Sequence, residues 1–91
     1  MSPTPYRSTP VFDHQTLPAA LRREHRTRKG VWGVIRVIEG EVRLSRSGGP
    51  DEGEILTSTR PGVIEPEETH RVEPLGPMRL QVDFYDRPPL S

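Results

Sequence analysis

The run from Val31 to Ile38 limits the possible folds more than any other stretch of the chain. It reads Val-Trp-Gly-Val-Ile-Arg-Val-Ile, and Gly30 and Gly40 bound it. β-Branched and aromatic residues suit a pleated strand. Both alternating sets of the run are largely apolar, which is typical of a strand that is covered on both faces. We therefore predict a central strand here, and the rest of the chain must provide the layers around it.

Shorter β-type runs follow one another along most of the remaining sequence. Eleven prolines and eight glycines mostly lie between these runs, where they mark turns. The expected strands are 9–12, 42–44, 54–57, 63–64, 70–73 and 78–85. With the central strand and one ambiguous segment, this makes roughly seven to nine short strands, which predicts an all-β sandwich or small barrel.

The segment 16–27 fits two structures. Thr16 is a good helix cap, and the proline, alanines, leucine and arginines that follow favour the first turns of a helix. As a strand, the same segment would place one set of side chains on a single face: Leu21, Arg23, His25 and Thr27. Propensity alone slightly favours the helix.

Length and composition predict one domain with a thin core. The chain has 91 residues, of which 31% are hydrophobic, and no cysteine. We expect a single domain over 1–91, with loose tails at 1–6 and 87–91. A core this small favours a partner subunit, so we also expect a homodimer. Without cysteine, a metal site would need histidine and carboxylate ligands.

Charge and hydropathy exclude several classes of function. Thirteen basic residues balance thirteen acidic ones, and few aromatic residues accompany them, so we expect no nucleic-acid binding. No apolar run approaches the roughly 20 residues that span a bilayer. The first residues also lack the charged and apolar regions of an export signal, so we predict a cytoplasmic protein with no membrane contact.

Two polar groups, each next to an expected strand, are candidates for a site. The first is His25 to Thr27, and the second is Glu65 to His70. We predict that they converge in space. Taken singly, each histidine is more often a surface or hydrogen-bonding residue than a ligand.

The pattern around both histidines resembles a small cupin, and in particular the TehB/YeaR-like family of single-domain cupins related to tellurite-resistance proteins. The resemblance rests on segments that run in order through nearly the whole chain: Arg7-Ser-Thr-Pro10, Leu17-Pro-Ala19, His25-Arg-Thr27, Gly30-Val-Trp-Gly33, Val37-Ile-Glu-Gly40, Pro61-Gly-Val-Ile-Glu-Pro66, His70-Arg-Val-Glu73 and Val82-Asp-Phe84. It implies a jelly-roll barrel (a double-stranded β-helix) in which Leu21 to Thr27 is a strand.

The resemblance also implies a site near the barrel mouth, but two of the four usual cupin metal ligands are missing. Thr27 stands at the second histidine position, and Gly33 stands at the glutamate position. Glu67 lies three residues before His70 and is our choice to replace the lost carboxylate. The predicted metal ligands are therefore His25, His70 and Glu67, holding zinc, nickel or iron. The alternative for Glu67 is a solvated loop carboxylate.

Three further residues are predicted to contact a small polar or anionic ligand: Thr27, Arg23 and Asp83. Arginines suit oxyanions, although a run of them is more often a solvated face. Asp83 either faces the interior, where it needs a partner, or lies on the wet side. The resemblance implies a link to bacterial tellurite or nitrogen-oxide stress. No catalytic residue is assigned, and a metal-dependent enzyme and a non-catalytic dimeric interaction module are the alternatives.

Overall fold

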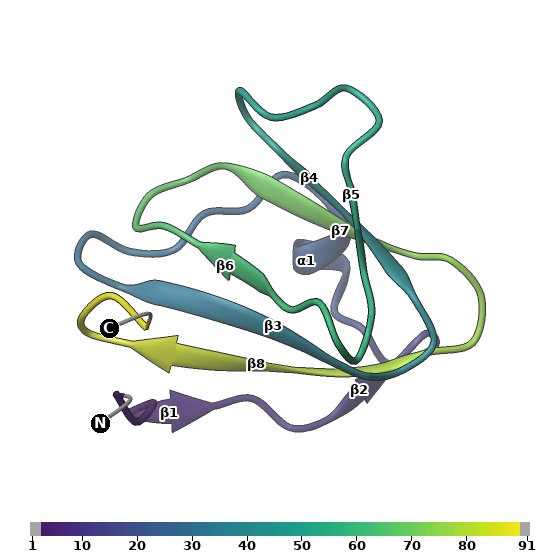
Figure 1. Cartoon of the computed structure of the whole chain (residues 1–91), viewed down its shortest axis with the longest axis horizontal. Coiled ribbons are helices and arrows are strands. Elements are labelled where there is room, and N and C mark those ends of the chain that lie inside the picture. The colour runs from purple at the N-terminus through teal and green to yellow at the C-terminus, as the bar shows by residue number, and fades with distance from the viewer. Residues whose placement is uncertain (1–2, 90–91) are drawn as a thin grey trace.

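The computed structural model describes residues 3–89, which form short strands and one short helix (Figure 1). In chain order these elements are β1 (Arg7–Ser8), β2 (Phe12–Asp13), α1 (Ala19–Arg22), β3 (Trp32–Glu39), β4 (Val42–Arg46), β5 (Glu54–Leu56), β6 (Gly62–Ile64), β7 (His70–Pro74) and β8 (Arg79–Tyr85).

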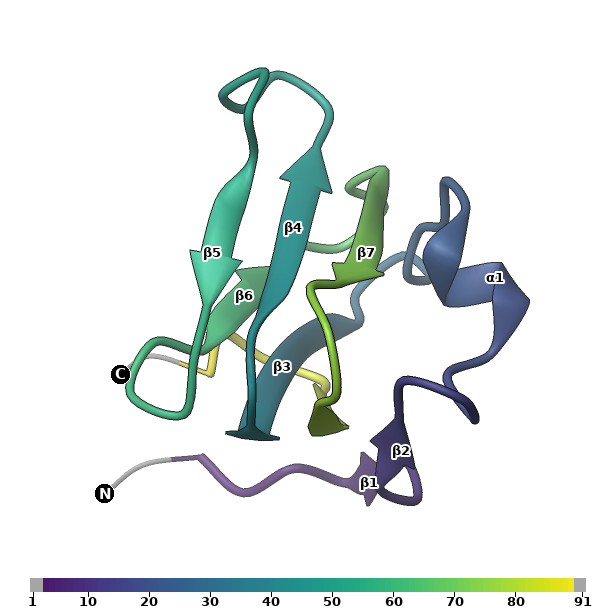
Figure 2. The same cartoon turned by 90° about the vertical axis from the view of Figure 1, so that its right-hand side faces the viewer.

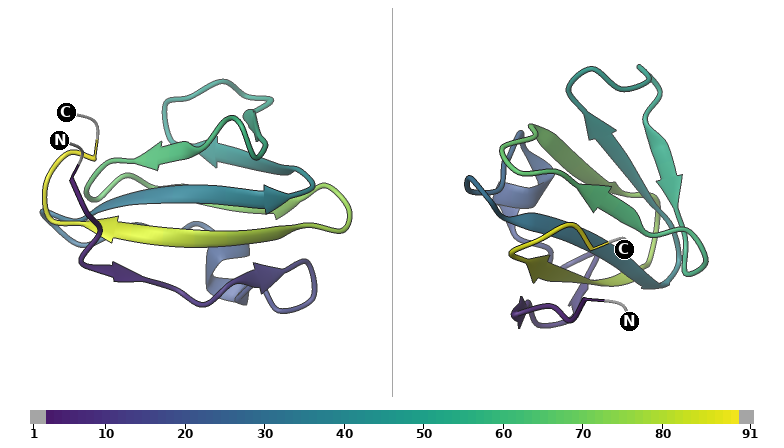
Figure 3. Two further views of the ribbon diagram at one scale, coloured as in Figure 1. Left: turned by 60° about the horizontal axis from the view of Figure 1, so that its bottom comes forward. Right: turned by 60° about the vertical axis from the view of Figure 1, so that its left-hand side comes forward.

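The strands make two antiparallel sheets that face each other (Figure 2). In the five-stranded sheet the order is β1-β8-β3-β6, and β2 also pairs with β8. Figure 3 shows β3 and β8, its two longest strands, lying side by side. In the three-stranded sheet the order is β5-β4-β7, and α1 packs beside β7. The prediction of an all-β fold is confirmed.

A single hydrophobic core fills the space between the two sheets. Side chains alternate along each strand, so every second residue faces this space. The buried core residues are Leu17, Ile35, Val37, Val42, Leu44, Leu56, Ile64, Val72, Met78, Leu80 and Val82. Full burial of one such side chain contributes roughly 1.5–3 kcal/mol. The few hydrophobic residues of this chain are thus concentrated in one layer.

The outer face of β3 is less covered than its sequence predicted. Val34 is 9% exposed there, but Ile38 is 42% exposed and Arg36 is also exposed. No layer within residues 3–89 covers this face, because the only other sheet packs against the opposite one.

Gly40 makes the sharp turn between β3 and β4. Its φ is +78°, and an added Cβ would lie 2.9 Å from the Cα of Met78. Gly30 has the same φ, but an added Cβ there would meet nothing within 4 Å. Gly40 is therefore required both for its backbone conformation and for a close approach to the turn before β8.

Two predictions about the architecture need correction. Within residues 3–89 the sheets are not joined into a closed barrel, since each strand pairs only within its own sheet. Leu21 to Thr27 is not a strand. The helix former Leu21 lies in α1, which follows Pro18, and only His25 pairs, in an isolated bridge with His70. Local helix propensity therefore prevailed over the pattern implied by the resemblance.

The remaining strands lie close to their predicted positions, apart from the first. The expected edge strand at 9–12 is instead two short pieces, β1 and β2, on either side of Thr9. Thr9 still pairs with the sheet, because its N–H donates to the carbonyl of Val82 at 2.9 Å.

Part of the predicted N-terminal tail is attached to the sheet. The N–H of Tyr6 donates to the carbonyl of Phe84 at 3.0 Å. Residues 1–2 and 90–91 of the predicted tails lie outside the described residues. No helix between residues 3 and 89 is long and apolar enough to cross a membrane. The cytoplasmic location stays a prediction.

Candidate functional site

His25 and His70 lie together at one end of the space between the sheets. Their backbones exchange two hydrogen bonds of 2.8 Å, so His25 lies directly beside His70, the first residue of β7. Their ring centroids are 5.6 Å apart, and the ring planes make an angle of 83°. The structure thus brings together the two polar groups on which the sequence analysis concentrated. We call His25, Thr27, His70 and the loop 65–69 the histidine site.

Burial controls the protonation of His70. This residue is only 5% exposed, and burial lowers the pKa of its imidazole below the usual value. The neighbouring His25 and Arg46 lower this pKa further, whereas the backbone carbonyl and the carboxylate of Glu68 oppose the effect. The neutral ring is therefore the favoured form of His70 at neutral pH.

Thr27 fixes the loop that leads to His70. Its hydroxyl donates to the carbonyl of Glu65 at 3.2 Å and accepts from the N–H of Glu67, also at 3.2 Å. Glu67 is exposed and has a φ of +62°, which is unusual for a residue other than glycine. The Thr27 hydroxyl, which was predicted to contact a ligand, thus already makes two hydrogen bonds to the protein, and the ligand contact stays a prediction.

The residues gathered here do not fit a three-ligand metal centre. No group of three or more His, Cys, Asp or Glu side chains within residues 3–89 is arranged to hold a metal ion. His25 and His70 supply two imidazoles, but Glu67 does not join them as a third ligand. Since a protein zinc site has at least three ligands, the predicted set of His25, His70 and Glu67 is not assembled in this structure.

Arg46 is the central charged residue beside the histidine site, and the sequence analysis missed it. Its side chain is only 19% exposed, and it bonds to the carboxylates of Glu54 at 2.9 Å and Glu68 at 3.2 Å. It also donates to the carbonyl of Val63 at 2.9 Å, which links β4 to β6 of the other sheet. The alternation of β4 was the available signal, because it places Arg46 on the same face as buried Leu44.

Arg23 and Asp83, two of the predicted ligand contacts, lie elsewhere. Arg23 is exposed just after α1 and makes no hydrogen bond or ion pair with the described part of the chain. Asp83 lies on the outer face of the five-stranded sheet, where it accepts from Arg36 at 2.5 Å and from the hydroxyl of Ser8 at 2.6 Å. The carboxylate of Asp83 is buried, and Arg36 is the cation that compensates its charge.

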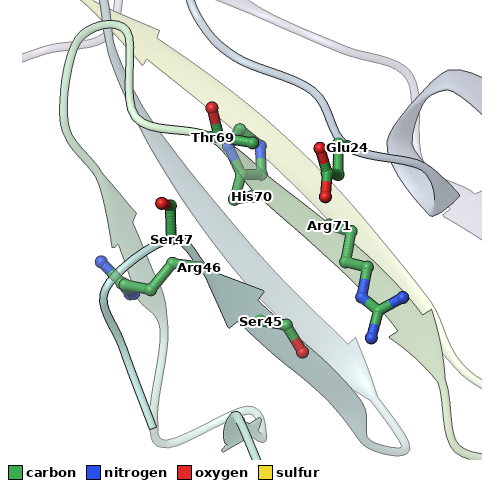
Figure 4. Close-up of a pocket in the computed structure, with 7 residues that line it drawn as sticks. All are labelled: Glu24, Ser45, Arg46, Ser47, Thr69, His70 and Arg71. Atoms are coloured by element: carbon green, nitrogen blue, oxygen red, sulfur yellow. The ribbon is translucent and has the colours of Figure 1, made fainter. Parts of the chain in front are cut away.

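His70 lines two cavities. The first is an open depression of about 460 Å³, shown in Figure 4, with Arg46 pointing away from Glu24 and Arg71. Its lining consists of Glu24, Ser45, Arg46, Ser47, Thr69, His70 and Arg71. The second is a small interior cavity of about 20 Å³, mostly apolar, in which Thr27 and His70 supply the polar side chains. That volume is room for about one water molecule.

Comparison with known proteins identifies the family. A profile described as the TehB-like domain matches residues 7–82. This chain belongs to the TehB-like family. It is 31% identical over 85 residues to a probable S-adenosyl-L-methionine-dependent methyltransferase TehB of Haemophilus influenzae, covering 88% of this chain and 30% of that protein. It is 30% identical to the uncharacterized protein YeaR of Escherichia coli K12, covering 90% of this chain and 76% of that protein.

Solved structures agree with the sequence relatives. The crystal structure of TehB from Haemophilus influenzae has a TM-score of 0.79 at 27% identity, covering 88% of this chain and 30% of that one. A crystal structure of an Escherichia coli K12 protein also has a TM-score of 0.79, at 29% identity, covering 92% of this chain and 90% of that one. The predicted TehB/YeaR-like family is confirmed. The chain spans only 30% of the length of the TehB relatives.

Proposed function

We propose that this TehB-like domain binds a small polar or anionic molecule at the histidine site. The observation that carries the proposal is the position of His70, which borders both the open depression and the interior cavity while its ring packs against that of His25. The hydroxyls of Ser47 and Thr69 and the guanidinium of Arg71 line the same depression. Such a concave surface with a few convergent polar groups suits a small ligand.

An oxyanion of the tellurite type is the ligand class that we propose. One relative is named TehB, and the family resemblance implies a role in bacterial tellurite or nitrogen-oxide stress. Arginine and hydroxyl groups bind oxyanions through charge-assisted hydrogen bonds. Because the histidine site lacks a third metal ligand, the proposed binding uses hydrogen bonds from the protein itself. The cupin assignment belongs to the same proposal, supported by two facing sheets with a site at one end.

Titration calorimetry with sodium tellurite tests the binding. The wild type is expected to bind, and the double variant His25→Ala, His70→Ala is expected to lose binding while keeping its circular dichroism spectrum. The third histidine provides a matched control, because His14 lines neither cavity. Absence of binding by the wild type, or equal binding by the double variant, would remove the proposed function. Metal analysis of the same samples addresses zinc, nickel and iron: one ion per chain, lost in the double variant, would favour a metal-assisted site.

A dimeric interaction module is the second candidate, and one observation favours it. The outer face of the five-stranded sheet carries buried Val34 and three partly buried apolar side chains that no other layer within residues 3–89 covers: Trp32, Val63 and Tyr85. A homodimer would bury this face. Light scattering after size exclusion tests it: Val34→Lys should convert a dimer to a monomer, whereas a monomeric wild type would contradict the candidate.

A further inference from the structure

The two ring nitrogens of His70 have different surroundings. Nδ1 lies 3.0 Å from the backbone carbonyl oxygen of Glu68. A carbonyl oxygen can only accept, so Nδ1 must carry the proton. A neutral imidazole has one N–H and one lone pair, so the lone pair is on Nε2. The backbone of the loop thus sets the tautomer of His70.

The carbonyl that sets this tautomer is itself held in place. The carboxylate of Glu68 accepts from the guanidinium of Arg46 and from the N–H of Glu65, both at 3.2 Å. On the other side of the loop, the hydroxyl of Thr27 bonds to Glu65 and Glu67. Because side chains from two separate segments fix the loop, the ring cannot change tautomer without loss of a hydrogen bond.

Nε2 of His70 is available to a ligand. The hydrogen bond through Nδ1 is the only one that the ring makes with the described part of the chain. In the described part of the chain, the side-chain nitrogens that are fully buried and have no hydrogen-bond partner are His14 Nδ1, Arg43 Nε and Arg46 Nε. Nε2 of His70 is not one of them. His70 is a lining residue of both the depression and the interior cavity, and the lone pair of Nε2 is the group that its ring offers to a small molecule.

We infer that the histidine site selects a molecule that donates a hydrogen bond to Nε2 of His70, namely an oxyacid that still carries an O–H group. This inference rests on the proposed function and narrows its ligand class. A fully deprotonated oxyanion presents only oxygen lone pairs, and these would face the lone pair of Nε2. Such a mismatch leaves two acceptors without a proton between them, which predicts at least about tenfold weaker binding.

Hydrogentellurite and iodate form a matched pair of ligands for the test. Both are pyramidal monoanions of a heavy element with three oxygens, and only hydrogentellurite carries an O–H. Calorimetry at neutral pH is expected to show hydrogentellurite binding at least about tenfold more tightly than iodate. The variant His70→Gln should lose this preference, because a side-chain amide both donates and accepts.

Nitrogen-15 NMR of His70 reports the tautomer independently of any ligand. We expect a protonated Nδ1 and an unprotonated Nε2 in the free protein, and Glu68 or Arg46 variants that loosen the loop should change this ratio. A protonated Nε2 would overturn the inference. Equal binding of iodate and hydrogentellurite by a wild type whose His70 is protonated at Nδ1 would also overturn the inference, yet would leave the proposed function intact. Binding of neither ion, with the expected NMR signals, would show that the proposed function itself is wrong.

Discussion

The change Asp83→Asn removes a charge from a side chain that is 7% exposed. The aspartate accepts from Nε of Arg36 at 2.5 Å, from Nη2 of Arg36 at 3.2 Å and from the hydroxyl of Ser8 at 2.6 Å. A hydrogen bond to a charged group contributes about 1.5–3 kcal/mol. Arg36 is 47% exposed, so water compensates part of the loss there. We expect the variant to lose about 2 kcal/mol of unfolding free energy, or about 8–16 °C in Tm.

Acid titration gives this prediction a second signature. Burial alone would raise the pKa of Asp83, but the hydrogen bonds from Arg36 and Ser8 and the charge of Arg36 lower it below its ordinary value of 3.8. Between the two pKa values the unfolded chain binds more protons than the folded one, so stability falls as the pH falls. The contribution of Asp83 is present above about pH 3.8 and is lost as the pH falls through the folded pKa. The Asn variant should lack this part of the acid transition.

Urea unfolding at several pH values measures both effects. Asp86→Asn is the matched control, because in the described part of the chain Asp86 pairs only with its exposed neighbour Arg87, and the change should alter stability by less than about 0.5 kcal/mol. If Asp83→Asn is as stable as the wild type and keeps the same acid transition, the ion pair on this face does not stabilise the fold as argued.

Three further predictions concern the histidine site and the turns. His25→Ala should raise the pKa of His70 towards its usual value, because His25 opposes its protonation. Because the pKa of folded His70 is below its usual value, the unfolded wild type binds more protons below about pH 6.5 and the fold loses stability there. The variant should lose less stability, as NMR titration and urea unfolding can show. Gly40→Ala should cost more than about 2 kcal/mol, whereas Gly30→Ala should cost about 1 kcal/mol from its φ alone; equal costs in thermal unfolding would contradict the close approach at Gly40. Glu67→Asn should increase stability by a few tenths of a kcal/mol, since Asn tolerates the positive φ, and a loss in urea unfolding would show that the carboxylate matters.

Most of the strands could be predicted from the sequence, because alternation and turn residues act locally. β3 was expected at 31–38 and lies at Trp32–Glu39, and β8 was expected at 78–85 and lies at Arg79–Tyr85. Whether strand edges join into a barrel depends on how two sheets meet, and no local pattern encodes that. The two pieces β1 and β2 are separated by residues 9–11, and within this gap the side chain of Thr9 accepts from the N–H of Val82 at 3.1 Å, a contact across 73 residues.

The candidate site was predictable in part. The meeting of His25 and His70 followed from the pattern, whereas the importance of Arg46 did not, because its partners come from β5, β6 and the loop 65–69. Asp83 was recognised as a residue that needs a cation, but its face remained open, although the alternation of β8 puts Leu80 and Val82 on the core face and Asp83 on the other. Arg36 lies opposite Gln81, two pairs away from Asp83 in the register of β3 and β8 and so on the same face, which only the pairing reveals.

The bonds of Arg46 bear on local unfolding. One guanidinium joins the hairpin of β4 and β5 to β6 and to the loop 65–69, and the loop in turn carries Glu68 next to the histidine pair. Segments tied through a shared side chain open together. Amide protons at the hairpin tip and in the loop should therefore exchange with solvent at matching rates, so a molecule held at His70 would also slow exchange at the hairpin tip, beyond the residues that line the depression.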